Sequence, residues 1–77
     1  MSALDRIVVD PAILAGKPVI RGTRVPVHLL LAMLGSGASR EEVLREYPQI
    51  TGDDLDAAVL YASRVVASLD WVGFGVV

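Results

Sequence analysis

The sequence lacks several residue types that would define a class of protein. It contains no cysteine, one histidine, one tryptophan, one phenylalanine and two tyrosines. The missing cysteine excludes a disulfide scaffold, a thiol nucleophile and a thiolate metal site. The longest apolar run, Leu29 to Leu34, is far shorter than the ~18 residues of a membrane span. No basic stretch followed by an apolar one opens the chain, so we expect no export signal and a cytoplasmic protein.

What the sequence does contain is an excess of apolar residues for its size. The chain has 77 residues, of which 53% are hydrophobic. A domain of this length buries only about 60% of the surface that its unfolded chain exposes. We therefore expect part of the apolar surface to be covered by another chain, as a homo-oligomer or a hetero-oligomer.

Charge is distributed unevenly along the chain, although the net charge is only −2. Residues 1–24 contain four basic and two acidic residues, whereas residues 38–77 contain three basic and seven acidic ones. A balance so close to zero does not indicate a generally basic, polyanion-binding protein. The excess of positive charge lies in the N-terminal third of the chain.

The first 26 residues predict a short N-terminal β-hairpin. Val19 to Arg21 and Arg24 to Val25 are two β-type runs separated by the pair Gly22-Thr23. Glycine supplies the positive φ that the first central position of a type II′ turn requires. An earlier run, Ile7 to Val9, is also β-favouring, and Pro26 suits the first position of a following helix.

Three helices are predicted after the hairpin. The first covers 26–34 and ends at Gly35-Ser36-Gly37. The second begins at Ser39, which forms a capping box with Glu42, and ends before Pro48. A short second helix before a long third is the helix-turn-helix order.

The third helix is the strongest prediction in the chain. It begins at Thr51, with Asp54 as the cap partner. Its apolar positions lie within about 120° of one another, the width of a core-facing stripe. We expect these residues to face the core: Leu55, Ala58, Val59, Ala62, Val65, Val66 and Leu69.

The predicted hairpin also brings positive charges together. With Gly22-Thr23 as the turn, Arg21 and Arg24 face each other, and like charges at facing positions are destabilising. Either an external anion lies between them, or they pair with the chain's own Glu41, Glu42 or Glu46. The candidate residues for binding an anion or nucleic acid are Lys17, Arg21, Thr23, Arg24 and Arg40.

The C-terminal segment is apolar where a solvated tail would be polar. After Asp70 no charged residue follows, yet the only Trp and the only Phe are found here. Large aromatic residues are typical anchors of protein interfaces. We predict a domain over residues 1–68 and a partner-contacting tail over 69–77; the alternative is a tail folded back on its own bundle. The candidate partner-binding residues are Leu60, Leu69, Trp71, Val72, Phe74 and Val76.

The remaining polar residues do not suggest catalysis. Asp53, Asp54 and Asp56 do not have the spacing of a calcium loop, and they suit the positive end of a helix dipole. The same charges would repel DNA phosphates from the leading end of the third helix. His28 has no nucleophile or second ligand nearby in sequence. We expect no enzyme, no metal and no cofactor.

The N-terminal half carries an unusual string of motifs. Gly16-Lys17-Pro18 is followed by Ile20-Arg-Gly-Thr-Arg24 and then by Pro26-Val27; further along come Gly37, Glu42-Val-Leu44, Tyr47-Pro48 and Thr51-x-x-Asp54-Leu55. This pattern, over residues ~6–66, resembles the bacterial domain-of-unknown-function family 433. The resemblance implies a homeodomain-like fold of three helices. It also implies an antitoxin of a VapBC-like toxin–antitoxin pair, whose partner is a PIN-like ribonuclease and which can bind its own operator DNA.

Three functional hypotheses follow. The first is an antitoxin that inserts Arg21 or Arg24 into the acidic metal centre of the nuclease while the tail provides apolar anchoring. The second is a stand-alone dimeric transcriptional regulator whose hairpin arginines bind DNA phosphates. The third is a homo-oligomeric scaffold that uses Leu60 and the tail.

Overall fold

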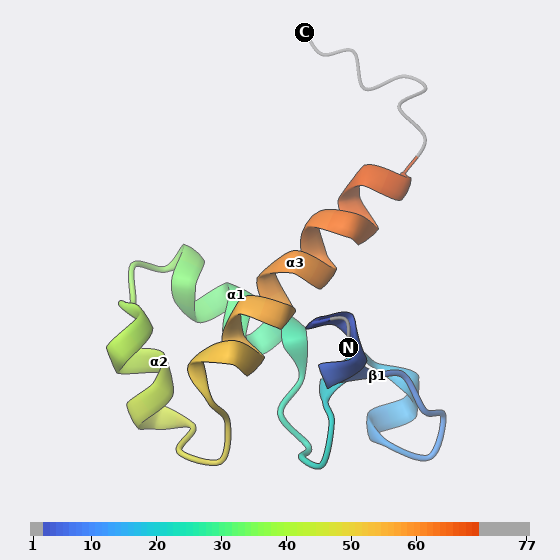
Figure 1. Ribbon diagram of the computed structural model, residues 1–77, viewed down its shortest axis with the longest axis horizontal. Helices are drawn as coiled ribbons and strands as arrows, with labels where there is room; N and C mark the ends of the chain where they lie inside the picture. Colours follow the sequence, from blue (N-terminus) through green and yellow to red (C-terminus); the bar gives the residue numbers. More distant parts are fainter. Residues whose placement is uncertain (1–2, 70–77) are drawn as a thin grey trace, which may run out of the picture.

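The computed structural model describes residues 3–69. A short antiparallel sheet precedes three helices, and the last helix runs diagonally across the molecule (Figure 1). This order confirms the predicted fold class. No helix within the described part of the chain is long and apolar enough to cross a membrane.

The N-terminal segment consists of short elements. A 3₁₀ turn, η1 (Ala3–Arg6), leads into strand β1 (Ile7–Val8), and a second turn, η2 (Leu14–Gly16), leads into β2 (Val19–Ile20). The two strands are antiparallel, with Ile7 opposite Ile20 and Val8 opposite Val19. The hairpin is therefore present, but its strands are Ile7–Val8 and Val19–Ile20 rather than the two runs beside Gly22.

The segment after Gly22 pairs along the other side of β2 through a single bridge. Val19 bridges Pro26, and the N–H of Ile20 donates to the carbonyl of Val25 over 3.0 Å. The predicted turn is shifted by one residue, because the N–H of Thr23 donates to the carbonyl of Ile20 over 3.0 Å. Gly22, with a φ of +80°, is thus the second central residue of the turn, as in a type II turn.

The three helices begin and end where the sequence predicts, within one residue. They are α1 (Val27–Gly35), α2 (Arg40–Glu46) and α3 (Gly52–Ser68). Pro26 is the N-cap of α1 rather than its first residue. The N–H groups of Gly37 and Ala38 donate to the carbonyls of Leu34 and Met33, the Schellman pattern, and Gly37 has the positive φ of +103° that this pattern requires.

Both predicted capping boxes are present. In α2 the Ser39 hydroxyl accepts from the N–H of Glu42 over 3.1 Å, and the Glu42 carboxylate accepts from the N–H of Ser39 over 2.7 Å. In α3 the same reciprocal bonds join Thr51 and Asp54 over 3.2 and 2.9 Å. Each box satisfies two N–H groups, one of them at a helix start that would otherwise lack a partner.

The core lies between the sheet and the first halves of the helices. Its largest fully buried side chains come from β2 and from all three helices: Val19, Ile20, Leu30, Val43 and Leu55. Ile7, Val25, Val27, Ile50, Ala57 and Ala58 complete it. The sheet therefore belongs to the hydrophobic core and fixes where the Gly22 turn lies relative to the helices.

The stripe predicted on α3 is buried over only part of its length. Leu55 and Ala58 are fully buried, as expected, but Val59, Val65, Val66 and Leu69 are 44%, 42%, 53% and 50% exposed. Every residue from Ser63 to Leu69 is exposed. The expectation that the whole stripe faces the core is wrong, because α3 continues past the domain that it packs on (Figure 1).

Candidate functional site

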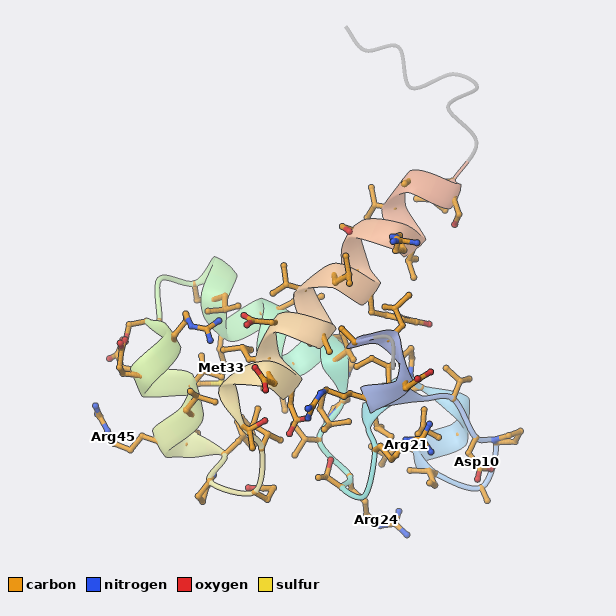
Figure 2. All side chains as sticks on the ribbon, in the orientation of Figure 1. Asp10, Arg21, Arg24, Met33 and Arg45 are labelled. Atoms are coloured by element: carbon orange, nitrogen blue, oxygen red, sulfur yellow. The ribbon has the colours of Figure 1, made fainter. Side chains whose placement is uncertain are left out.

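The Gly22 turn orients two of the candidate arginines differently. Arg21 is directed back to its own chain: its backbone N–H donates to the carbonyl of Arg6, and its Nε donates to the carbonyl of Asp5, each over 2.7 Å. Arg24 extends away from the domain (Figure 2). The predicted convergence of the two side chains on one anion is therefore not seen.

Within its own chain, the partner of Arg21 is not one of the predicted glutamates of the second helix. A backbone carbonyl in η1 accepts from the guanidinium instead. This bond, with the backbone bond to Arg6, fastens η1 to the turn, so Arg21 has a structural role that is sufficient to explain its position.

Thr23 is a structural residue of the same turn. Its hydroxyl donates to the carbonyl of Ile20 over 2.8 Å and accepts from the N–H of Val25 over 3.0 Å. The side chain is partly buried. These two bonds hold the turn closed and direct the adjacent Arg24 outward.

Lys17 and Arg24 remain as exposed candidate cations. No hydrogen bond or ion pair joins the guanidinium of Arg24 to another side chain of residues 3–69. Arg24, Thr23, Gly22 and Ile13 line an open hollow of about 470 Å³. Leu14 and Ala15, just before the Gly16-Lys17 pair, have φ of 48° and 57°. This is the left-handed region of backbone conformation, which residues other than glycine seldom adopt.

Arg40 does not belong to this cluster. It begins α2, and its guanidinium forms an ion pair with Asp56 and a long hydrogen bond of 3.5 Å to the carbonyl of Gly52. Arg40 therefore joins α2 to the start of α3. The five candidate anion-binding residues separate into two exposed cations, two turn residues and one interhelical ion pair.

Arg6 contacts the acidic start of α3. Arg6 Nη1 donates to Asp54 over 2.9 Å, and Arg6 Nη2 lies 3.8 Å from Asp53. These residues, with Ala3, Asp5, Arg21 and Asp56, surround an open hollow. Among residues 3–69, no group of three or more potential metal ligands is present.

Asp54 is the most buried of the three carboxylates, with 13% of its side chain exposed. Burial raises its pKa, but hydrogen bonds from the Thr51 backbone N–H, the Arg6 guanidinium and the Thr51 hydroxyl outweigh burial. The pKa of Asp54 consequently lies below its usual value. Sequence reasoning missed the role of Arg6, since nothing local links it to a residue 48 positions away.

Most of the large apolar side chains that are exposed among the described residues lie on α3. We call Val59, Ala62, Val65, Val66 and Leu69 the outer stripe. Leu60, which is 36% exposed, lies on another side of the helix, about 160° from Ala62 at 100° per residue. The tail residues Trp71, Val72, Phe74 and Val76 lie outside the described residues.

A second apolar surface on α1 was also missed by sequence reasoning. Leu29, Ala32, Met33, Ser36 and Ala38 line a shallow hollow on the outside of this helix. Leu29 is 37% exposed, and Met33 lies on the side of α1 near α2 (Figure 2). The available signal was the absence of Asp, Glu, Lys and Arg from residues 25–39.

These features define a small trihelical domain with a helix-turn-helix order, an N-terminal antiparallel sheet and an exposed apolar end. The sequence pattern of one family matches residues 7–62. The chain belongs to this family, DUF433, whose description is "Protein of unknown function". The matched segment ends within α3, so the outer half of that helix follows it.

Two relatives support the assignment. The uncharacterized protein y4eO of Sinorhizobium fredii is 38% identical over 61 residues, which are 79% of this chain and 28% of y4eO. A crystal structure of a DUF433 member protein from Anabaena variabilis aligns with a TM-score of 0.76 and 37% identity. That alignment covers 80% of this chain and 61% of the other. The chain thus spans less than two thirds of either relative.

Proposed function

We propose that this protein is an antitoxin, a non-catalytic binding module that neutralises a PIN-like ribonuclease by direct contact. The observation that carries the proposal is the second half of α3, which leaves the domain with large apolar side chains exposed on more than one side. Exposed apolar surface of this kind is typical of a protein interface. The resemblance to family 433, which implies a VapBC-like antitoxin, supplies the class of the partner.

The apolar anchor in this proposal is Leu60 together with the tail, residues 69–77. The tail follows directly on the end of α3, which points away from the domain (Figure 1). Aromatic side chains such as Trp71 and Phe74 are the residue types that most often dominate binding energy. The domain then acts as a rigid support for the segment that enters the nuclease.

The inhibitory group in this proposal is Arg24. A PIN-like nuclease holds its metal ions with a cluster of carboxylates, and guanidinium groups bind carboxylates with two parallel hydrogen bonds. Between the two candidate arginines, Arg24 is better placed than Arg21, whose Nε already donates to the Asp5 carbonyl. Arg24 would displace metal by occupying the carboxylates.

Co-expression with the product of the adjacent gene, which this proposal expects to be a PIN-like ribonuclease, tests the proposal. We expect the full chain to restore growth, and we expect a chain ending at Leu69 and the Arg24→Ala variant to fail. Arg45→Ala is the matched control, because Arg45 also extends from the domain, but on α2 (Figure 2). Full protection by the truncated chain would eliminate tail anchoring, and full protection by Arg24→Ala would eliminate the arginine.

A second candidate function is a dimeric DNA-binding regulator, favoured by the exposure of Lys17 and of Arg24. Asp53 and Asp56, whose side chains are 79% and 62% exposed, oppose it, because they lie where the reading helix would approach phosphates. DNA binding through these cations should weaken steeply as salt concentration rises, whereas an apolar protein complex should be comparatively insensitive. Titration of the operator and of the nuclease at two salt concentrations separates the two functions.

A further inference from the structure

We propose that the outer stripe of α3 is a dimerisation seam, and that its occupant is the outer stripe of a second copy of this chain, packed antiparallel. The proposal concerns the isolated protein and does not depend on the nuclease. It begins from an observation on α3 itself: the stripe continues without a break from Leu55 and Ala58, which are fully buried, to side chains that are about half exposed.

The spacing of the stripe fits a helix as the occupant. Leu55, Ala62 and Leu69 recur every seven residues, and so do Ala58 and Val65. This is the a/d spacing with which two helices pack side by side. A strand or an extended peptide would not match a repeat of this period.

Charge favours a second copy of the same face. Between Ala57 and Leu69 the only charged residue is Arg64. It lies about 160° around the helix from Ala62, so it faces away from the stripe. Two copies can therefore meet across a two-fold axis without burying a charge or placing like charges against each other.

Side-chain size favours the antiparallel orientation. If the two-fold axis passes between Ala62 and Val65, each Ala62 faces the Val65 of the other copy. Both central layers then combine a small with a larger side chain, which gives interdigitated packing. A parallel pair would instead place Ala62 against Ala62 and leave a gap.

The position of the helix end supports the same arrangement. The outer stripe runs roughly 15 Å from Val59 to Leu69, at 1.5 Å per residue. Eight further residues, 70–77, follow Leu69 in the sequence. In an antiparallel pair, Leu69 of each copy lies beside the domain of the other.

The area of the seam sets the expected affinity. A half-exposed Val or Leu side chain offers roughly 30–60 Å² of apolar surface. The four such residues of the outer stripe fall well below the ~800 Å² per partner of a standard interface. We therefore expect a weak dimer, in reversible equilibrium with the monomer.

Sedimentation equilibrium of the isolated full chain, from roughly 10 µM to 1 mM, measures this association. We expect the average mass to rise from monomer toward dimer. Val65→Asp should raise the dissociation constant at least about tenfold, because the carboxylate would be buried in the seam. Ala67→Asp introduces the same group two residues further on, about 160° away, and should change the constant less than about twofold.

Circular dichroism shows whether both variants keep their helices, which we expect because residues 65 and 67 are exposed in the single chain. The proposed dimer would be contradicted if the chain is a monomer at every concentration. It would also be contradicted if the dissociation constants of the two variants differ by less than stated. If the full chain dimerises but does not bind the nuclease, that result would count against the proposed function alone.

Cysteine pairing tests the orientation, since the chain has no cysteine of its own. In the antiparallel pair a mixture of Ala62→Cys and Val65→Cys chains should form disulfide dimers faster than either variant alone. The same residue in both copies would be too far apart for a disulfide, whose Cα atoms lie within about 7 Å. Equally fast pairing of either variant by itself would overturn the antiparallel arrangement.

Discussion

Arg6 Nη1 and Asp54 Oδ1 lie 2.9 Å apart and join the first turn of the chain to the first turn of α3. Asp54 is also the third residue of α3, where its other carboxylate oxygen accepts the N–H of Thr51. One carboxylate therefore caps a helix and holds the N-terminal segment against it. The basic N-terminal third and the acidic remainder of the sequence thus meet in the folded protein.

The first prediction concerns this pair. Arg6→Ala should lower the free energy of unfolding by about 0.5–1 kcal/mol, since the guanidinium is partly exposed and such pairs are weak. Asp54→Ala should lower it by about 1–2 kcal/mol, because the bond that the Asp54 carboxylate accepts from the Thr51 N–H is lost as well. Urea denaturation of both variants measures the difference. Equal effects would show that the capping bond contributes nothing.

The second prediction concerns acid. The pKa of Asp54 is lower in the folded chain than in the unfolded one, so its contribution to stability is complete above the unfolded value of about 4 and is lost as the pH falls through the folded value. The N–H of Ser39 likewise lowers the pKa of Glu42. Thermal unfolding between about pH 6 and 2 should show this loss. Asp54→Asn should reduce the slope, and an unchanged slope would contradict the assignment.

The third prediction contrasts two residues of the α3 stripe. Leu55 is fully buried, and Leu55→Ala should reduce the stability of the domain by about 2–5 kcal/mol. Val66 is 53% exposed, and Val66→Ala should change the stability of the monomer by less than about 0.5 kcal/mol. Chemical denaturation at a dilution where the protein is monomeric measures both. A large loss for Val66→Ala would mean that the outer half of α3 is covered by its own domain.

The fourth prediction concerns backbone conformation at the turn. Gly22 has space for a Cβ, yet its φ of +80° disfavours any side chain, so Gly22→Ala should destabilise the domain by about 1 kcal/mol. Gly35 is the matched control: it also has space, but its conformation is helical. Gly35→Ala should leave stability unchanged or raise it by up to about 0.5 kcal/mol. Equal effects in thermal denaturation would remove the conformational explanation.

The ends of the helices were determined by the sequence itself. Ser39 with Glu42, and Thr51 with Asp54, act through hydrogen bonds that span three residues, and Gly37 ends α1 by its own backbone preference. Signals of this range are fully contained in a short stretch of sequence. The order of three helices and the presence of a hairpin could be predicted for the same reason.

Only the tertiary structure decided which segments meet. Ile7 rather than Arg24 is in the strand beside β2, Arg21 bonds to η1, and Arg40 pairs with Asp56 on another helix. The sequence identified candidate cations by residue type, but their separation into exposed and structural roles depended on these long-range partners. Likewise, periodicity identifies the apolar side of α3 but not how far the neighbouring elements extend along it. A stripe is buried only where another element covers it, and the domain ends before the helix does.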